Sequence, residues 1–196
     1  MTQKRRKQKI VICIAGMTGC GKSTVAKRLA KKYGLKYLSG GEALKNLAVA
    51  AGYKPGGGGW WESEEGTRFL RQRMTDPQFD RRVDEELIKE AKHGNVVLDS
   101  WTMPWLLNEG FKVWLEASPR VRTERIAKRD GISLEEAFNA LKEKDKRTKV
   151  IYKKLYGFDL GEDFSPFNAI LDTDELDVEE IYQTLYLIIE RLLLKP

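Results

Sequence analysis

The sequence has few cysteines and no long run of apolar residues. Its two cysteines, Cys13 and Cys20, lie seven positions apart, so the disulfide framework of a secreted domain is not expected and a reducing cytoplasm is. No apolar stretch approaches the roughly 20 residues that a helix needs to cross a bilayer. No apolar signal-peptide segment follows the basic N-terminus. We therefore expect a cytoplasmic protein that does not enter a membrane.

Net charge is scarce outside one short segment. The chain has 196 residues, 41% hydrophobic and 33% charged, which suits one globular core and excludes a disordered chain. The formal net charge is +6, but the basic side chains among residues 1–9 contribute +5 and leave +1 for the rest. Residues 1–9 thus form a basic tail on a nearly neutral body. A short solvated terminus is one interpretation of this tail, and contact with RNA phosphates is the other.

Short β-branched runs alternate with amphipathic segments along the whole chain. Strands are predicted over residues 10–15, 37–39, 96–99, 111–115 and 169–172. Helices are predicted over residues 22–33, through Ala43 and Ala48, from Asp76-Pro77 to Gly94, from Ser118-Pro119 to Gly131, after the capping pair Ser133 and Glu136, and after the capping pair Asp177 and Glu180. The last helix is expected to bury Ile181, Leu185, Ile188 and Leu192. The pattern predicts a three-layer α/β domain with a mostly parallel, five-stranded sheet.

The turn between the first predicted strand and the first predicted helix carries a phosphate-binding motif. Residues 16–24 satisfy G-x-x-x-x-G-K-[ST] in the strand–turn–helix context that this motif requires. In such a loop the backbone N–H groups hold phosphates, Lys22 reaches the β- and γ-phosphates and Ser23 binds Mg²⁺. A dinucleotide loop requires a third small residue after Gly19-x-Gly21, where Lys22, Ser23 and Thr24 follow instead, and a plain glycine turn accounts for neither Lys22 nor Ser23. The expected contacts of ATP are Gly16, Thr18, Gly19, Cys20, Gly21, Lys22, Ser23 and Thr24.

Asp99 ends the third predicted strand, after the apolar residues 96–98. In a phosphate-loop fold this is where a second acidic residue lies near Mg²⁺. Capping of the following turn is the alternative role of a carboxylate at a strand end. With the phosphate loop present, the sequence favours Ser23 and Asp99 as the ligands of Mg²⁺.

Four stretches carry a family resemblance: residues 16–24, residues 80–84 leading into 95–99, residues 114–133, and residues 155–159. In these stretches the chain resembles the nucleoside-monophosphate kinases and, within them, the archaeal-type cytidylate kinases. The likeness runs from about residue 9 to the C-terminus. It implies a P-loop NTPase fold in a single domain over residues 10–196, which moves the γ-phosphoryl group of ATP to a nucleotide phosphate with Mg²⁺. It also implies two mobile parts, an acceptor-binding segment at about 40–94 and a helical lid at about 132–160.

The candidate catalytic residues are basic, because phosphoryl transfer needs charge stabilisation and alignment more than covalent chemistry. Arg122 and Arg125 follow the fourth predicted strand, and Lys144 and Arg147 lie on the predicted lid. We expect these four and Lys22 to act on the transferred group, with Arg122 also contacting ATP. A solvated basic face is the alternative interpretation of any single lysine on this helix.

The acceptor half departs from the family pattern. Lys45 stands where cytidylate kinases carry an arginine, and the arginine that they place after the third strand is absent from residues 99–102. The glycine-rich loop at residues 56–59, which we expect to be mobile, is followed by two adjacent tryptophans. These tryptophans either stack on a base, or one packs in the core while the other lies at the surface. The candidate acceptor contacts are Lys45, Trp60, Trp61, Arg68, Asp80, Arg81, Asp84 and Trp101.

Three functions are consistent with these features. The first is a monomeric, ATP- and Mg²⁺-dependent kinase of nucleoside monophosphates, with CMP or dCMP as the first acceptors to test. The second is a kinase of RNA or another larger acceptor, supported by the basic tail and the tryptophan loop. The third is an ATP-hydrolysing switch that binds a protein or RNA partner and transfers phosphate only to water.

Overall fold

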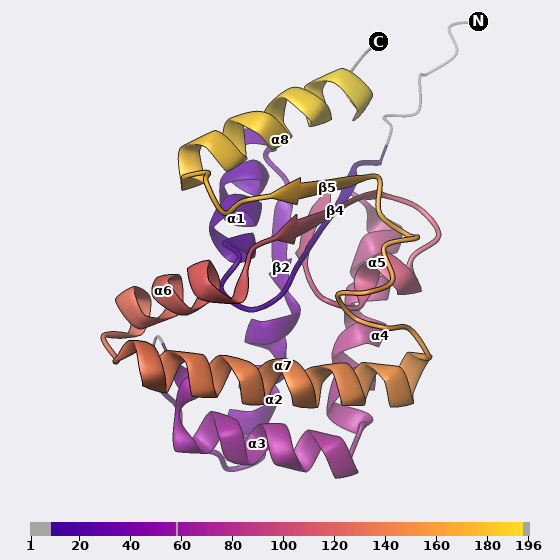
Figure 1. Cartoon of the computed structure of the whole chain (residues 1–196). Coiled ribbons are helices and arrows are strands. Elements are labelled where there is room, and N and C mark those ends of the chain that lie inside the picture. The colour runs from indigo at the N-terminus through magenta and orange to yellow at the C-terminus, as the bar shows by residue number, and fades with distance from the viewer. Residues whose placement is uncertain (1–8, 58, 194–196) are drawn as a thin grey trace, which may run out of the picture.

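A parallel sheet of five strands lies at the centre of the fold (Figure 1). The computed structural model describes residues 9–57 and 59–193. The strands are β1 (Val11–Ala15), β2 (Lys36–Ser39), β3 (Val96–Asp99), β4 (Phe111–Glu116) and β5 (Ala169–Asp172), in the order β2-β3-β1-β4-β5. Every pair of neighbours is parallel. The predicted five-stranded α/β fold is therefore confirmed.

The central strand explains why residues 10–15 are continuously apolar. β1 pairs with β3 on one side and with β4 on the other, and Ile12, Cys13 and Ile14 are fully buried. A strand covered on both faces has no position for a solvated side chain. The carboxyl ends of β1 and β3 lie in register, with Ile14 opposite Asp99. This register places Asp99 beside the loop that follows β1.

Helices cover both faces of the sheet. On one face, α1 (Lys22–Tyr33) and α8 (Val178–Leu193) bury Leu29 and Leu185 against β1 and β4. On the other, α2 (Gly40–Ala50), α4 (Gln78–His93) and the short α5 (Met103–Leu106) pack Leu44, Leu87 and Met103 against β3. These layers give the predicted three-layer arrangement. Both cysteines are buried free thiols, Cys13 on β1 and Cys20 in the following loop.

Three further helices lie beyond the sheet. They are α3 (Glu64–Thr75), α6 (Pro119–Asp130) and α7 (Leu134–Tyr156), with the one-turn 3₁₀ helix η1 (Trp60–Glu62) before α3. In Figure 1, α3 and α7 run side by side at the end of the molecule away from α8, and the two helices are in contact. The sequence analysis named neither α3 nor α5 nor η1. α7 occupies most of the predicted lid, and α3 lies within the predicted acceptor-binding segment.

The predicted helix caps are present, with one shift. Ser133 and Glu136 form a reciprocal capping box at the start of α7, and Asp177 and Glu180 exchange the equivalent bonds before α8. The helix predicted to start with Asp76 as its cap begins instead at Gln78, with Pro77 as the N-cap. The reason is that α3 continues to Thr75, so Asp76 caps the end of α3 while its carboxylate accepts the Gln78 N–H.

The expected core positions of the last helix are found as far as the structure describes them. Ile181 and Leu185 are buried, and Ile188 packs against the same cluster. The side chain of Leu192 lies outside the described residues. Within residues 9–57 and 59–193, no helix has the length and apolar character needed to cross a membrane.

Candidate active site

The loop between β1 and α1 has the geometry of a phosphate cradle. Gly16 and Gly19 have positive φ angles of 142° and 87° and lie so close to Leu115 O and Arg122 O that a Cβ would come within 2.3 and 2.9 Å of them. Glycine is needed at both positions. The N-terminus of α1 is capped by Gly21 without a side-chain hydrogen bond, whereas α2, α3, α6 and α7 each have a serine cap. The backbone N–H groups in the first turn of α1 therefore remain available to an anion.

The polar side chains of this loop also fit a phosphate. The buried hydroxyl of Thr18 finds no hydrogen-bond partner among the described residues, as expected of a group whose partner is a ligand. Lys22 donates to Met17 O over 2.8 Å, and its Nζ lies 5.5 Å from the centre of the Trp101 ring. Trp101 in turn donates its indole N–H to Gly16 O over 2.6 Å. Trp101 therefore braces the loop and one side of Lys22.

Ser23 and Asp99 meet as the sequence predicts for a pair of magnesium ligands. Ser23 Oγ donates to Asp99 Oδ2 over 2.6 Å, and Tyr37 donates its hydroxyl to the same oxygen over 3.1 Å. The described residues contain no group of three or more His, Cys, Asp or Glu side chains that could cage a metal. One hydroxyl and one carboxylate suit Mg²⁺, which takes few protein ligands and completes its shell with phosphates and water. The sequence analysis missed Tyr37, whose phenol pKa is raised by burial and by Asp99.

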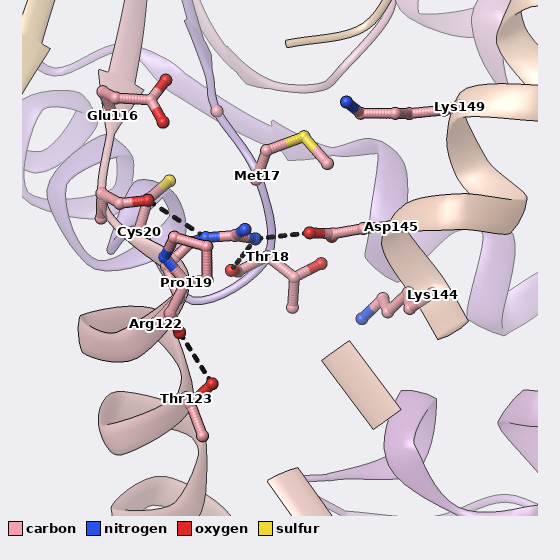
Figure 2. A network of polar contacts seen from close by, with 12 residues as sticks. Met17, Thr18, Cys20, Glu116, Pro119, Arg122, Thr123, Lys144, Asp145 and Lys149 are labelled. Carbon is pink, nitrogen blue, oxygen red and sulfur yellow. Dashed lines mark hydrogen bonds and ion pairs between the residues drawn. The ribbon is translucent and has the colours of Figure 1, made fainter. Parts of the chain in front are cut away.

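Arg122 ties the phosphate loop to the predicted lid. Its guanidinium donates to Ala117 O over 3.2 Å, to Thr18 O over 3.3 Å and to Asp145 Oδ2 over 2.8 Å. Figure 2 shows this side chain between the loop and α7, with Lys144 and Asp145 both reaching toward it from the helix. Only 8% of the Arg122 side chain is exposed. In this arrangement Arg122 holds the two elements together.

A cavity of about 600 Å³ runs from the phosphate loop toward α4. It also touches Arg125, whose guanidinium donates to Thr173 O and Leu176 O at the start of the β5–α8 loop. The predicted site residues that line this cavity are Thr18, Gly19, Gly21, Lys22, Ser23, Thr24, Trp61, Asp80, Asp84, Asp99, Trp101, Arg125 and Lys144. The structure thus brings the predicted phosphate, metal and acceptor groups to one place.

Other predicted acceptor residues lie away from this lining. Lys45 donates to the carbonyl of Gly56, the exposed Arg68 pairs with Glu65, and Arg81 is exposed. Trp60 is 4% exposed, packs edge-on against Trp61 and donates its indole N–H to Lys54 O over 2.9 Å. Burial of the Trp60 ring agrees with the interpretation in which one tryptophan packs in the core, and it corrects the expectation that Trp60 offers a face to a base. Trp60 packs in the core, and only Trp61 reaches the cavity.

Three predicted ATP contacts, Gly16, Cys20 and Arg122, and one lid residue are also outside the lining. Cys20 is fully buried within the loop, and Gly16 is packed against Leu115 O and the Cys20 sulfur. Arg147 pairs with Glu143 one turn earlier on α7, and its Nη1 lies 3.4 Å from the sulfur of Met74. The catalytic role of Arg147 stays a prediction.

The acceptor end of the cavity holds a buried ion pair that the sequence analysis missed. Arg73 from α3 donates to Asp80 through Nε over 3.0 Å and through Nη2, and the side chains of both are 1% exposed. Arg73 Nη2 also donates to the hydroxyl of Tyr152 from α7 over 3.3 Å. A paired geometry of this kind compensates the cost of burying both charges. The only signal in the sequence was the cluster of arginines after the tryptophans.

Asp84 is the second buried carboxylate at this end. It accepts hydrogen bonds from the hydroxyls of Thr102 and Tyr156, each over 2.6 Å, and is 5% exposed. Burial raises the pKa of Asp84 from 3.8 to about 6, against the opposing effect of the two hydroxyl donors. The charge of Arg73 also lowers the pKa of Asp84, but Arg73 is paired with Asp80, and burial keeps the pKa of Asp84 raised.

Comparison with known proteins identifies the family. The sequence model of the cytidylate kinase-like family matches residues 11–175. The chain belongs to the cytidylate kinase-like family. It is 36% identical to the cytidylate kinase of Pyrococcus horikoshii over 90% of this chain and 86% of that protein. It is also 32% identical to the cytidylate kinase of Methanocaldococcus jannaschii, over 88% of this chain and 93% of the relative.

Solved structures of other kinases share the fold of this cytidylate kinase-like protein. The shikimate kinase of Acinetobacter baumannii in complex with shikimate superposes with a TM-score of 0.58, at 19% identity over 96% of this chain and 97% of the other. A gluconokinase of Sinorhizobium meliloti gives a TM-score of 0.51 at 16% identity, over 95% of each chain. The predicted family and enzyme class, a nucleoside-monophosphate kinase, are confirmed.

Proposed function

We propose that this protein transfers the γ-phosphoryl group of ATP to a cytosine nucleoside monophosphate, CMP or dCMP, with Mg²⁺ as cofactor. The observation that carries this proposal is the single cavity that joins the phosphate loop to the buried carboxylate of Asp84. Its relatives in Pyrococcus and Methanocaldococcus carry the name cytidylate kinase. The cytoplasmic location and the monomeric state stay predictions from the sequence.

At the donor end, the chain offers the phosphates one mobile cation and a ring of N–H groups. Among the described residues Lys22 contacts neutral groups, Met17 O, the Cys20 thiol at 3.8 Å and the Trp101 ring, so its charge is free to follow the β- and γ-phosphates. Ser23 and Asp99 would hold Mg²⁺ beside them. Bound there, Mg²⁺ neutralises charge on the transferred group and orients it. Arg125 lies at the opposite wall, where it fixes the β5–α8 loop.

At the acceptor end, the chemistry of Asp84 favours cytosine over uracil. A carboxylate only accepts hydrogen bonds, and each oxygen of Asp84 has accepted one, which leaves lone pairs for another donor. Cytosine presents an amino group on its edge, whereas the corresponding group of a uracil-type base is a carbonyl acceptor. Trp61 supplies an aromatic wall to the same cavity. A carbonyl facing Asp84 would leave two acceptors opposed, which costs binding energy.

The test is a coupled assay of ADP formation with CMP, dCMP, UMP, AMP, GMP and a short RNA as acceptors. We expect transfer to CMP or dCMP and at least about tenfold less to UMP, the cost of one unmade buried hydrogen bond. Omission of Mg²⁺ should abolish transfer. Transfer only to RNA would replace this proposal with the RNA kinase, and hydrolysis independent of acceptor would replace it with the ATPase switch.

A further inference from the structure

Glu62, at the end of η1, bridges two cations from the helices above the cavity. Its Oε1 lies 3.2 Å from Lys144 Nζ on α7, and its Oε2 lies 3.3 Å from Arg129 Nη2 on α6. Only 6% of the Glu62 side chain is exposed. One carboxylate thus joins the acceptor-binding segment to α6 and to α7, the helix that makes up most of the predicted lid. The sequence analysis gave Glu62 no role.

Lys144 depends on this carboxylate for its charge. It lies at the cavity wall, 8% exposed, with its Nζ 5.3 Å from the centre of the Trp61 ring. The charged groups that face it in the described structure are Glu62 from η1, Arg129 from α6 and Lys22 from α1. Of these only Glu62 is negative. Burial above all, and then the two cations, lower the pKa of Lys144, while Glu62 raises it.

Arg129 does not compete strongly for Glu62, because it has a carboxylate of its own. Its guanidinium donates to both oxygens of the adjacent Asp130, over 2.7 and 2.6 Å. The side chain of Arg129 is also about half exposed, whereas that of Lys144 is 10% exposed. An ion pair in a dry site is worth more than one at the surface, where water and salt screen it. The pair with Lys144 is therefore the more important of the two contacts.

The position of Glu62 is set by the acceptor segment. η1 is seated on the start of α3 so closely that a Cβ on Gly66 would come within 2.2 Å of Trp60 O. Trp60, two residues before Glu62, is buried in the core. The carboxylate consequently reaches Lys144 only when this segment is seated beneath the lid.

We propose that Glu62 is a positioning residue, which keeps Lys144 protonated and aimed into the cavity while the tryptophan segment is seated against the lid. The inference rests on the proposed function, in which Lys144 is a cation that stabilises charge on the transferred phosphoryl group. It adds a coupling: the lid carries its positive charge in the cavity only when the acceptor segment is in place.

The experiment compares Glu62→Gln, Lys144→Arg and the double variant, with Glu64→Gln as the matched control. Glu64 is exposed at the start of α3, two residues further along the same segment. The pKa of Lys144 is read by carbon-13 NMR of labelled lysine side chains in the enzyme without substrate, and Lys144→Arg assigns the signal. Steady-state transfer is measured between pH 7 and 9.5, above the range in which Asp84 titrates.

We expect Glu62→Gln to lower the pKa of Lys144 and to make the transfer rate fall with rising pH, by about tenfold per unit above the new pKa. The unmodified enzyme and Glu64→Gln should show no such fall. Glu62→Gln with Lys144→Arg should lose the pH dependence whatever its absolute rate, because a guanidinium stays protonated. A purely structural role for Glu62 would lower the rate of Glu62→Gln and of the double variant by the same factor at every pH.

Two results would overturn the proposal. One is a Lys144 pKa that is unchanged in Glu62→Gln, and the other is a pH dependence that persists in the double variant. The NMR measurement needs no acceptor, so it stands even if the proposed acceptor is wrong. If the assay finds no transfer to any monophosphate, the proposed function fails while the Glu62–Lys144 coupling is still tested.

Discussion

At the scale of single residues, the site is built from cations that differ in what already holds them. Arg73, Lys144 and Arg122 are each paired with a carboxylate, whereas Lys22 contacts a backbone carbonyl, the Cys20 thiol and an aromatic ring and forms no ion pair within the described residues. A paired cation gives up an existing partner to meet a phosphate, and an unpaired one does not. Lys22 is thus the residue whose charge is most directly available to the transferred group.

Replacing this lysine by alanine should abolish transfer without unfolding the protein. Lys22→Ala removes one preorganised electrostatic contact, which corresponds to a loss of turnover on the order of 10²-fold or more. The thermal unfolding midpoint should change little, because the contacts of Lys22 with the described residues are a hydrogen bond to Met17 O, the Cys20 sulfur and the Trp101 ring. Lys31→Ala, on the exposed end of the same helix, serves as the control. A folded Lys22→Ala variant with near-normal turnover would refute the phosphate-loop mechanism.

Asp84 should give acceptor binding and stability opposite dependences on pH. Its pKa is raised to about 6 in the folded protein, above the ordinary value of 3.8. The folded state therefore holds the proton more tightly than the unfolded state does. The tighter proton binding of Asp84 therefore adds to the free energy of unfolding. This contribution, on the order of 3 kcal/mol, is fully present below about pH 4 and is lost as pH rises through 6. Acceptor binding, which needs the ionised carboxylate, should instead weaken below pH 6.

The measurements are the KM for CMP and the urea midpoint of unfolding between pH 4.5 and 7.5, with Asp84→Asn as the comparison. We expect the KM for CMP to rise more steeply on acidification in the unmodified enzyme than in Asp84→Asn, where only the second ionisation of the CMP phosphate, with a pKa of about 6, remains in this range. At pH 7.5 the variant should bind CMP roughly tenfold less tightly or worse. A KM for CMP that stays constant down to pH 5 would remove Asp84 from the acceptor site.

At the scale of elements, η1 and α3 explain how the acceptor segment differs from the sequence-based expectation. A glycine run followed by two tryptophans indicated a loop, but the tryptophans open a short 3₁₀ turn that is docked on α3. Trp60 and Trp61 sit on the same turn and have different surroundings. One belongs to the core and the other to the cavity.

Replacing Trp60 should therefore affect the stability of the fold, and replacing Trp61 should affect acceptor binding. Trp60→Ala should lower the free energy of unfolding by roughly 3–5 kcal/mol, the range for a large buried side chain. Trp61→Ala should weaken acceptor binding by about 1–3 kcal/mol, the range for an aromatic stacked on a base, and leave ATP affinity nearly unchanged. Calorimetry and equilibrium titration distinguish these effects. Equal losses of stability in both variants, with unchanged acceptor affinity, would show that neither ring binds the substrate.

An element could be predicted from the sequence when the residues that determine it lie close together along the chain. The phosphate loop, the strands and the serine-capped α7 were predictable because their determinants lie within a few residues of one another. α3 was not, because its buried face includes the charged Arg73, which makes a core position look like a solvated one. α5 is too short to show a period.

Two contacts of the site were not predictable from the sequence because they, too, leave no local signal. Arg73–Tyr152 and Glu62–Lys144 each join residues about 80 positions apart. No pattern of spacing encodes such pairs, since they arise when α3 and η1 pack against α7. By contrast, Ser23 and Asp99 are equally distant in sequence, yet a motif and a strand end mark both. Motif residues are predictable at long range, and ion pairs between helices are not.

At the scale of the whole molecule, the excess positive charge is concentrated in one part of the sequence, since residues 1–9 contribute +5 of the net charge of +6. Deleting residues 1–8 should leave monophosphate turnover unchanged at physiological salt, since the predicted catalytic residues all lie between Lys22 and Arg147. The control is the full chain assayed across a range of salt concentrations, because contacts with an RNA backbone weaken steeply as salt rises. A salt-sensitive loss of activity on RNA, with no activity on monophosphates, would instead favour the RNA kinase.

The strand order also constrains how this enzyme is made. β1 and the phosphate loop leave the ribosome early, yet the two neighbours of β1 are β3 and β4, which are synthesised much later. Non-local parallel pairing of this kind closes long loops and is slow. A nascent chain that stops before Phe111 leaves at least one edge of β1, a wholly apolar strand, without its partner, and such an edge is a target for chaperones and for aggregation. We expect the nascent chain to acquire nucleotide binding in one late step of translation, only after β4 has been completed.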